Sequence, residues 1–349
     1  MGRRVIVTGG AGYIGSHICK SLASAGIQPI VYDNLATGHR HSIRWGAFIE
    51  GDIQDCARIT QALCDFEPEA VIHCAGSAYV EESLADPLKY YRNNVIGALS
   101  LLEACGRSGI NKIVFSSSCA VYGIPAQLPV SEASPLCPIS PYGQSKLMVE
   151  QLLRDCGEVH GIRYVALRFF NAAGADLDGE LSERHYPETH LIPRALLAAS
   201  GQLPCLTVYG DDHDTMDGSC LRDYVHVTDL ADVHIKAIDY LREGNANLTA
   251  NLGSGQPTSV FEIVQAVESI TGRPVPFVIQ PRRSGDPSAL YADCSHAREK
   301  LGFSAPRSDI STIVHTAAPT FGHAVSGAPV DAGARSYTCN TARSAVAAR

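Results

Sequence analysis

The stretch Val5-Ile6-Val7-Thr8-Gly9-Gly10-Ala11-Gly12-Tyr13-Ile14-Gly15-Ser16 runs a short apolar segment directly into a glycine-rich turn. Gly9, Gly12 and Gly15 recur at every third position. Glycine permits a tight turn and lets backbone N–H groups approach phosphate oxygens at the N-terminus of the following helix. Because glycine triplets also occur by chance, the prediction of a dinucleotide site rests on the strand before this turn and the helix after it.

An acidic residue closes the next predicted strand. Asp33 follows Gly9 by 24 positions, and its carboxylate is suited to accept hydrogen bonds from an adenosine ribose diol. It would repel a 2′-phosphate, which favours NAD over NADP; the alternative is that Asp33 only begins a turn. Later strand ends predict an adenine contact at Asp52 and Ile53, and room for the nicotinamide ribose and diphosphate at three small residues, Cys74, Ala75 and Gly76. By themselves these are ordinary turns.

The first half of the chain alternates short β-branched runs with amphipathic helical stretches, which is typical of βαβ units and a parallel sheet. Strands are expected at Arg4–Thr8, Pro29–Tyr32, Ala47–Glu50, Ala70–His73, Lys112–Ser116 and Tyr164–Arg168. Helices are expected at Gly12–Ala25, Asp55–Phe66, Pro87–Ser108 and Pro141–His160. The predicted fold class is therefore α/β, a Rossmann-type doubly wound parallel sheet.

The pattern changes after about Asn171. A stretch rich in Asp, Glu, Gly and His, Gly174–Thr189, is predicted to be a loop over a ligand. Shorter elements follow at Leu191–Ala199, Leu206–Tyr209, Tyr224–Val227, Val227–Arg242, Ala250–Leu252 and Val260–Thr271. The predicted domains are a dinucleotide-binding domain at 1–171, a smaller α/β substrate lobe at 172–321, and a low-complexity tail at 322–349 that is expected to be disordered.

Composition limits the class of protein. The chain has 349 residues, 45% of them hydrophobic and 18% charged, as in a globular protein, and its net charge of −8 predicts no nucleic-acid partner. No apolar stretch approaches the roughly 20 residues that span a bilayer, so no membrane partner and a cytoplasmic location are expected. The 12 cysteines and 13 histidines contain no C-x-x-C, H-x-x-x-H or H-E-x-x-H pattern. Reduced cysteines and no metal are therefore predicted.

A second motif carries the chemistry, Ser140-Pro141-Tyr142-Gly143-Gln144-Ser145-Lys146. Tyr142 and Lys146 are four apart on a predicted helix and share one face. A phenol with a pKa near 10 is a poor base, but an adjacent ammonium and a positive nicotinamide ring would lower that pKa. Ser118, at the end of the fifth strand, can hydrogen-bond the same substrate oxygen. Y-x-x-x-K pairs are common on exposed helices, so this pair could occur by chance. Here it follows a serine-rich strand end, and that order favours a catalytic role.

With these motifs the chain resembles the extended short-chain dehydrogenase/reductase superfamily and, within it, the UDP-glucose (UDP-galactose) 4-epimerase family. The resemblance runs from Arg4 to about Leu301. The segments that carry it are Gly9–His17, Asp33-Asn34, Glu82-Ser83, Asp86–Asn94, Phe115–Gly123, Ser140–Lys146, Leu167–Asn171, Gly210–Asp212, Asp217-Gly218, Arg222–Val227, Asn251–Gly253 and Arg282–Asp286.

The resemblance implies a tightly held NAD that is reduced and reoxidised within one turnover. Tyr142 would take the proton of the C4 hydroxyl while hydride leaves C4, the 4-keto sugar would rotate, and hydride would return to its other face. Ser118 would bridge the reacting oxygen and Lys146 would bind the nicotinamide ribose. Further cofactor contacts would come from Tyr13, Ile14, Asn34, Asn93 and Phe170.

For the UDP-sugar, the resemblance implies diphosphate contacts from Asn171, Arg222 and Arg283, and a contact of Asp286 with the uridine ribose. The other substrate residues would be His190, Leu191, Thr207, Val208 and Tyr209. Two arginines suit one diphosphate because a guanidinium fork matches phosphate oxygens; the alternative for Arg222 is an ion pair with Asp223 or Asp229. A homodimer formed through the third and fourth helices is expected by family analogy.

Several departures keep related activities open. Ala78 stands where family members often carry lysine, Pro187–Leu191 replaces a common pair of asparagines, and Leu290 stands where a tyrosine or a small residue gates N-acetylated sugars. The alternatives are a UDP-xylose/UDP-arabinose or UDP-N-acetylhexosamine 4-epimerase. A 4,6-dehydratase is disfavoured because Ser118-Cys119-Ala120 replaces Thr-Asp-Glu, and an NADPH reductase is disfavoured by Asp33. A non-catalytic NAD-binding regulator is the alternative from a different class.

Overall fold

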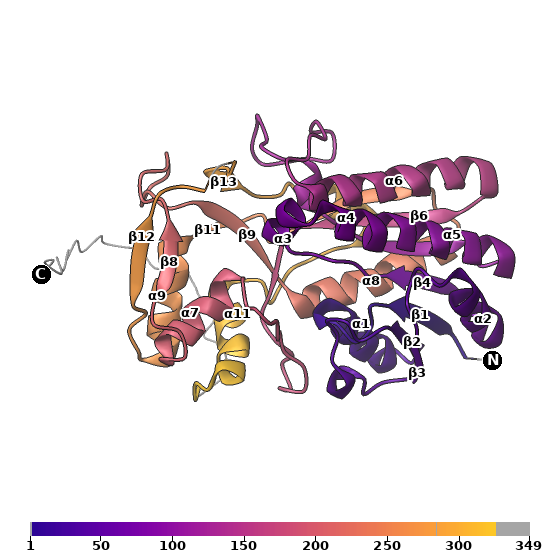
Figure 1. Cartoon of the computed structure of the whole chain (residues 1–349), viewed down its shortest axis with the longest axis horizontal. Coiled ribbons are helices and arrows are strands. Elements are labelled where there is room, and N and C mark those ends of the chain that lie inside the picture. Colours follow the sequence, from indigo (N-terminus) through magenta and orange to yellow (C-terminus); the bar gives the residue numbers. More distant parts are fainter. Residues whose placement is uncertain (1, 284, 326–349) are drawn as a thin grey trace, which may run out of the picture.

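A seven-stranded, all-parallel sheet forms the centre of the larger part of the molecule (Figure 1). The computed structural model describes residues 2–283 and 285–325. The order of the strands is β10-β6-β5-β4-β1-β2-β3. Their bounds are β1 Arg4–Thr8, β2 Gln28–Asp33, β3 Ala47–Glu50, β4 Ala70–His73, β5 Lys112–Ser118, β6 Arg163–Phe169 and β10 Leu248–Leu252. This confirms the predicted doubly wound α/β fold.

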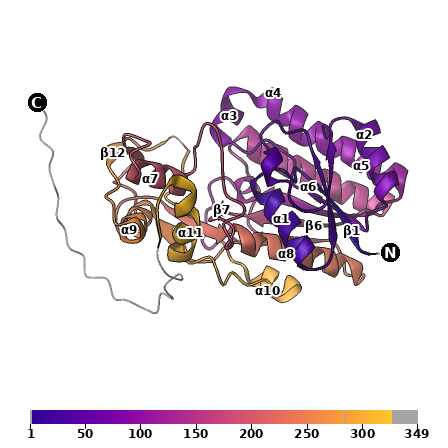
Figure 2. The same ribbon diagram turned by 90° about the horizontal axis from the view of Figure 1, so that it is seen from below.

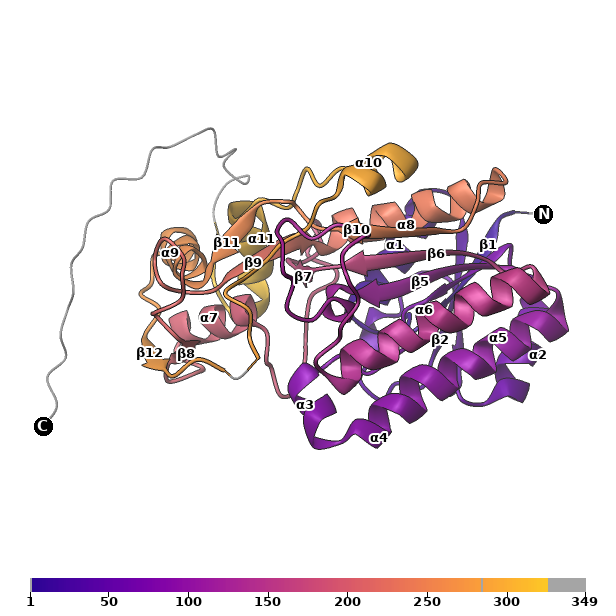
Figure 3. The ribbon, with the colours of Figure 1, turned by 90° about the horizontal axis from the view of Figure 1, so that it is seen from above.

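Helices cover both faces of this sheet (Figure 3). On one face pack α1 (Tyr13–Ser24), α8 (Val227–Arg242) and α10 (Ser295–Leu301), whose apolar side chains share one core cluster with β1. On the other face pack α2 (Cys56–Phe66), α5 (Gly97–Ser108) and α6 (Pro141–His160) around a second cluster. Burial of these two apolar faces positions the carboxyl ends of the strands, where the predicted site lies.

One predicted helix is interrupted. The stretch Pro87–Ser108 contains α4 (Pro87–Tyr90), a π-helical segment (Tyr91–Ile96) and then α5, while a short α3 (Val80–Ala85) precedes it. π-Helical segments often occur at functional sites because the widened turn redirects side chains. Here the segment carries Asn93 and Asn94.

The smaller part of the molecule holds two further sheets. Strand β9 (Leu221–His226) pairs with β7 (Asn171–Ala173), β11 (Pro257–Ser259) and β13 (Ala289–Leu290), and β8 (Leu206–Tyr209) pairs with β12 (Phe277–Gln280). Three helices pack around a third core cluster, and Figure 2 shows them away from the main sheet: α7 Leu191–Ala199, α9 Val260–Thr271 and α11 Ile310–Ala317.

Two features differ from the sequence expectation. Strand β10 and helix α8 belong to the large sheet and its covering layer, although the sequence assigned both to the smaller lobe. Residue 171 is therefore not a clean boundary between the part that contains the large sheet and the smaller part. The predicted tail at 322–349 lies outside the described residues from 326 onward, and His323 before that point is buried and contacts the Leu196 carbonyl at 2.8 Å. Among the described residues no helix is both long enough and apolar enough to cross a membrane.

Candidate active site

The glycine turn between β1 and α1 has one open side. Gly9 has a φ of +73° and a Cβ there would lie 2.6 Å from the Ala75 nitrogen, while a Cβ on Gly15 would lie 2.2 Å from the Gly9 oxygen. Both positions are therefore closed by backbone. Gly12, the N-cap of α1, has only the Gly9 oxygen within reach, at 3.3 Å, and no side chain caps this helix. Its first-turn N–H groups and the helix dipole suit an anion such as a pyrophosphate.

Asp33 lies at the carboxyl end of β2 beside this turn. One carboxylate oxygen accepts a hydrogen bond from the Leu35 nitrogen at 2.8 Å, as in a turn, and the other from the Ala11 nitrogen at 2.9 Å. Burial raises the pKa of this carboxyl group, while the two backbone hydrogen bonds oppose the rise. Asp33 therefore both begins a turn and joins the glycine turn, which is the position required of a ribose acceptor.

The other predicted adenosine contacts divide into two kinds. The Asn34 amide donates to the Asp52 carboxylate at 2.9 Å, so these two polar groups lie together on the surface beside Asp33. Ile53 is 4% exposed and belongs to the core cluster beneath α5, where a Cβ on Gly97 would meet it at 2.6 Å. Ile53 therefore has a clear packing role in the core.

The end of β4 lies against the catalytic group. The Cys74 sulfur lies 3.1 Å from the Ser116 hydroxyl, and a Cβ on Gly76 would lie 3.7 Å from the Lys146 ammonium. Small residues at this strand end therefore keep space open in front of Lys146. Ala75 packs partly against the core.

Asn94 is a polar residue that the sequence did not single out. It is 2% exposed, accepts from the Ser77 nitrogen at 2.8 Å, and donates to the Ser77 oxygen at 3.0 Å and the Ser145 hydroxyl at 2.9 Å. The predicted Asn93 donates to the Ser77 hydroxyl at 3.1 Å. Asn94 thus connects the loop after β4 to α6. The sequence alone does not distinguish it from Asn93, because what sets it apart is its burial.

Tyr142 and Lys146 lie on the first turns of α6, as predicted. Ser140 caps the helix by accepting from the Gly143 nitrogen at 3.1 Å, and Pro141 occupies the first turn. The Ser118 hydroxyl lies beside the Tyr142 phenol and acts to lower the pKa of Tyr142. The Lys146 ammonium donates to the Ser116 carbonyl at 2.8 Å and lies 5.9 Å from the centre of the Tyr142 ring. The structure thus brings the three predicted catalytic residues together.

The pKa of Tyr142 corrects one expectation. Burial raises it to about 12, and the Ser118 hydroxyl only partly opposes this rise. Burial also disfavours the ammonium of Lys146 and lowers the pKa of Lys146 to about 8. In the protein alone the phenol is therefore a weak acid, and a phenolate depends on the two positive charges expected from the sequence, the Lys146 ammonium and the nicotinamide ring.

A buried ion pair supports this group from behind. The Arg168 guanidinium on β6 contacts both oxygens of Glu150 on α6, at 2.9 and 2.5 Å, and Glu150 also accepts from the Ser117 hydroxyl at 2.5 Å. Arg168 donates to the Tyr122 hydroxyl at 2.9 Å as well. Charge-assisted bidentate pairs are geometrically specific. This pair therefore holds α6 and the strand end that carries Ser118 in a defined register.

The predicted nucleotide-sugar residues form a second, more exposed group. Arg222 on β9 pairs with Asp286, and it does not pair with Asp223 or Asp229, which corrects the proposed alternative. The Arg283 guanidinium lies 3.9 Å from the centre of the Tyr209 ring and 3.1 Å from Glu81 of α3. It therefore connects β8 of the smaller part with a helix of the part that contains the large sheet. Arg222 is thus held by Asp286, and Arg283 is held against Tyr209 of β8.

The remaining substrate candidates lie on neighbouring elements. The Asn171 amide on β7 donates to the Asp223 carbonyl at 2.7 Å, and Phe170 is buried just before it. Leu290 on β13 is paired in register with Arg222. Thr207 and Val208 lie on β8 with Tyr209, and Val208 is buried.

His190 and Leu191 mark the start of α7. Burial opposes a charged His190 ring, but Glu183 and Glu188 outweigh it and raise the pKa of His190 to about 10. The ring of His190 lies 6.2 Å from that of Tyr79, and the hydroxyl of Tyr13 donates to the Gly174 carbonyl at 2.6 Å. The loop before α7 is therefore fastened beside the glycine turn.

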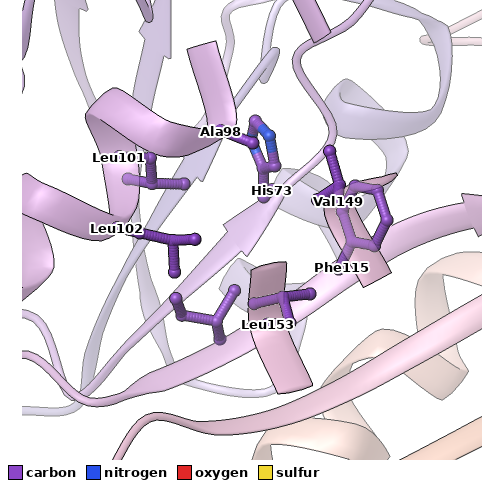
Figure 4. A pocket seen from close by; sticks show the side chains of 8 residues that line it. His73, Ala98, Leu101, Leu102, Phe115, Val149 and Leu153 are labelled. Atoms are coloured by element: carbon purple, nitrogen blue, oxygen red, sulfur yellow. The ribbon is translucent and has the colours of Figure 1, made fainter. Parts of the chain in front are cut away.

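An apolar void beneath the sheet is separate from this site. It lies between α5, α6 and the sheet, measures about 10 Å³, and is lined by His73, Ala98, Leu101, Leu102, Ile113, Phe115, Val149 and Leu153 (Figure 4). It is too small for a nucleotide and belongs to the core.

The open glycine turn, the acidic strand end and the Ser–Tyr–Lys group together define a nicotinamide-dependent enzyme of the short-chain dehydrogenase type. The chain belongs to the NAD dependent epimerase/dehydratase family, whose model matches residues 5–253. This confirms the family recognised from the sequence.

Individual relatives share most of the chain. A UDP-glucose 4-epimerase of Rhizobium leguminosarum bv. trifolii is 48% identical over 316 residues, which cover 90% of this chain and 96% of the relative. The crystal structure of the Brucella ovis UDP-glucose 4-epimerase in complex with NAD is 56% identical with a TM-score of 0.92, and covers 93% of this chain and 100% of that one. A Stenotrophomonas maltophila UDP-glucose-4-epimerase with bound NAD and formylated UDP-arabinopyranose is 38% identical with a TM-score of 0.89, at 91% and 98% coverage.

Proposed function

We propose that the chain catalyses the reversible C4 epimerisation of a UDP-sugar, UDP-glucose and UDP-galactose, with NAD held throughout the turnover. The observation that carries this proposal is the contact of the Tyr142 phenol with Ser118, one helical turn from Lys146 and beside the open end of β4. The relatives support the same reaction, because they are named UDP-glucose 4-epimerases and two were crystallised with NAD.

The residues divide the work between proton transfer and orientation. Bound NAD supplies the hydride acceptor and donor at C4. Tyr142 accepts the proton of the C4 hydroxyl and returns it, while Ser118 hydrogen-bonds the same oxygen and so orients it toward the phenol. The Lys146 ammonium would bind a hydroxyl of the nicotinamide ribose. Its positive charge beside Tyr142 also favours a phenolate. Asp33 binds the adenosine ribose of the cofactor, and the first turn of α1 binds its pyrophosphate.

The nucleotide-sugar residues would hold the diphosphate while the sugar turns. Arg222 and Arg283 supply two guanidinium groups, and Asp286, which pairs with Arg222, contacts the uridine ribose. Because the 4-keto sugar must present either face to the cofactor, binding energy belongs on the nucleotide and not on the sugar. Charged contacts confined to the nucleotide end suit this requirement.

Other sugars on the same nucleotide are the second candidates. The formylated UDP-arabinopyranose bound by the Stenotrophomonas relative supports a pentose substrate. Leu290 lies opposite Arg222 at the position that the family resemblance connects with N-acetylated sugars. It is neither the tyrosine nor the small residue of that position, so UDP-N-acetylhexosamines stay an open alternative. The intact Ser118, Tyr142 and Lys146 group argues against a non-catalytic NAD-binding regulator.

A homodimer through α5 and α6 is also proposed. Several apolar side chains around these helices are exposed, which supports an interface there: Ile96, Leu99, Met148 and Val159. A cytoplasmic location remains a prediction from the sequence.

A panel of UDP-sugars tests the proposal. We expect the purified full-length chain to carry NAD, visible in its absorbance after denaturation, and to equilibrate UDP-galactose with UDP-glucose without added cofactor. UDP-xylose, UDP-arabinose and UDP-N-acetylglucosamine are assayed on the same preparation and should turn over with lower kcat/KM. A preparation that binds NAD but converts none of these sugars would contradict the proposed reaction.

A further inference from the structure

A cluster of two histidines and two glutamates lies in the loop between β7 and α7. One ligand atom from each of Glu183, His185, Glu188 and His190 lies within 4.8 Å of all the others. Their spacing is E-x-H-x-x-E-x-H, which matches none of the short metal-binding patterns considered in the sequence. Only the path of the loop brings the four side chains to one point.

The distances within the cluster have the size that a tetrahedral metal site requires. One Glu183 oxygen lies 2.9 Å from the His190 Nδ1 and 3.2 Å from the His185 Nδ1. The two Glu188 oxygens each face one ring, at 3.1 Å from the His190 Nδ1 and 3.7 Å from the His185 Nδ1. A tetrahedron with metal–ligand bonds of about 2.0–2.1 Å has edges of about 3.3 Å. With one ligand atom from each residue within 4.8 Å of the others, the cluster is close to the size of such a site, and a small movement of the Glu188 carboxylate would complete it.

His185 gives an independent observation. Its Nδ1 is fully buried and makes no hydrogen bond, although it lies 3.2 Å from a Glu183 oxygen. A buried ring nitrogen that faces carboxylates at 3.2 and 3.7 Å without a well-aligned hydrogen bond is costly. A metal ion between the ring and the carboxylate would satisfy both groups.

The charge of the cluster is compatible with a metal ion. The side chains of Glu183 and Glu188 are only 5% and 9% exposed, and within residues 2–283 and 285–325 no lysine or arginine forms an ion pair with either carboxylate. One divalent cation with two neutral imidazoles would make the cluster neutral. Without a metal, two imidazolium rings whose centres are 5.1 Å apart balance the carboxylates, because Glu183 and Glu188 raise the pKa of both rings.

A second cluster in the same loop provides a contrast. Asp176, Asp178 and Glu180 also lie within metal-binding distance of one another, but the Lys20 ammonium already sits among them at 2.7, 2.6 and 2.9 Å. The positive charge of that cluster comes from a lysine of α1. In the histidine–glutamate cluster, among the described residues, only its own two histidines face the carboxylates.

The surroundings of the cluster are those of a fixed metal site. The Glu188 carboxylate accepts hydrogen bonds from the Thr189 and His190 nitrogens at 2.8 and 2.9 Å, which orients it as a ligating carboxylate is commonly oriented. The ring of His185 lies edge-on to Tyr13 of the glycine turn and to Tyr79, at 6.3 and 5.7 Å between centres.

We propose that Glu183, His185, Glu188 and His190 form a binding site for a divalent transition-metal ion of the zinc class, which closes the loop before α7 against the glycine turn. Two imidazole nitrogens and two carboxylate oxygens suit Zn²⁺, whereas Mg²⁺ and Ca²⁺ prefer oxygen ligands alone. With four protein ligands the ion is structural. It takes no part in the chemistry at Tyr142.

Metal content tests the proposal directly. The full-length chain is treated with a chelator, dialysed, reloaded with Zn²⁺ alone and measured by plasma mass spectrometry, and we expect one Zn²⁺ per chain. Loss of an outer-shell partner alone costs 10–100-fold in metal affinity. Removing two ligands in Glu183→Gln/His190→Asn should therefore weaken binding by about 100-fold or more.

Two controls and a spectrum keep the test decisive. Asp178→Asn changes the neighbouring cluster and His160→Asn removes an exposed histidine from α6, and both should retain the metal. Co²⁺ in place of Zn²⁺ should give the intense visible absorption of a four-coordinate ion. Retained NAD shows that each variant is folded. A wild-type chain that holds no stoichiometric Zn²⁺, a six-coordinate Co²⁺ spectrum, or undiminished binding in the double variant would overturn the proposal.

Discussion

The catalytic group and the nucleotide-sugar group of this molecule are built in opposite ways. Ser118, Tyr142 and Lys146 come from one strand end and one long helix, and each is at most 7% exposed. Arg222, Arg283 and Asp286 come from short strands and connections, and the Arg283 side chain is 46% exposed. Lys146 has no acidic partner among the described residues, whereas both arginines are paired with carboxylates.

This difference separates two requirements of the proposed reaction. Proton transfer at C4 needs fixed distances, and a buried group behind the Glu150–Arg168 pair supplies them. Holding a nucleotide while its sugar turns needs affinity away from the reacting atoms, and exposed charged side chains supply that. Substitutions in the first group should therefore lower kcat, and substitutions in the second should raise KM.

The largest expected effect is at Tyr142. Tyr142→Phe keeps the ring and its packing but removes the group that exchanges the C4 proton, so kcat should fall by about 10²-fold or more. The measurement is the rate of UDP-galactose conversion by protein whose NAD content equals that of the wild type. Tyr240→Phe on α8 is the matched control and should keep full activity. Near-normal turnover by Tyr142→Phe would show that another group carries the proton.

The same contrast explains what could be predicted from sequence. Regular elements are set by local periodicity and capping, so Ala70–His73 and Pro141–His160 have the predicted bounds. Because Tyr142 and Lys146 depend on one helix, their proximity follows from their spacing. The catalytic group is therefore predictable from the sequence.

Features that depend on distant parts of the chain could not be predicted in this way. Ala250–Leu252 has the composition of a strand, but composition does not indicate which sheet the strand joins. The sequence predicted one continuous helix over Pro87–Ser108 and gave no sign of the π-helical turn, so the hydrogen bonds of Asn94 with Ser77 and Ser145 could not be predicted. The pKa of Tyr142 depends on burial, which a pair of residues on a helix does not reveal.

The second prediction concerns affinity. Arg222→Met removes a guanidinium that the proposed function places on the diphosphate, and a lost charge-assisted hydrogen bond costs about 1.5–3 kcal/mol. KM for the UDP-sugar should therefore rise about 10–100-fold, with kcat within about threefold of the wild type. Steady-state kinetics measures both. Arg242→Met, an exposed arginine of α8, is the control, and Arg222→Lys should recover part of the affinity. A fall in kcat at unchanged KM would place Arg222 with the catalytic group instead.

The smallest effect separates burial from charge at Lys146. Burial lowers its pKa from 10.5 to about 8, so between these values the unfolded chain binds a proton that the folded chain lacks, and stability rises with pH. The wild type should therefore gain about 1 kcal/mol in its free energy of unfolding, relative to Lys146→Met, from about pH 7 to about pH 9.

Urea unfolding of nucleotide-free protein measures this difference. Lys300→Met is the control, because the pKa of that exposed lysine is raised, so it stays charged in both states over the same range. A difference between wild type and Lys146→Met that stays flat with pH would mean that Lys146 keeps its proton in the folded protein. Lys146 would then carry a positive charge beside Tyr142 at every pH of the assay. In that case the catalytic group, like the nucleotide-sugar group, would depend on a permanent charge.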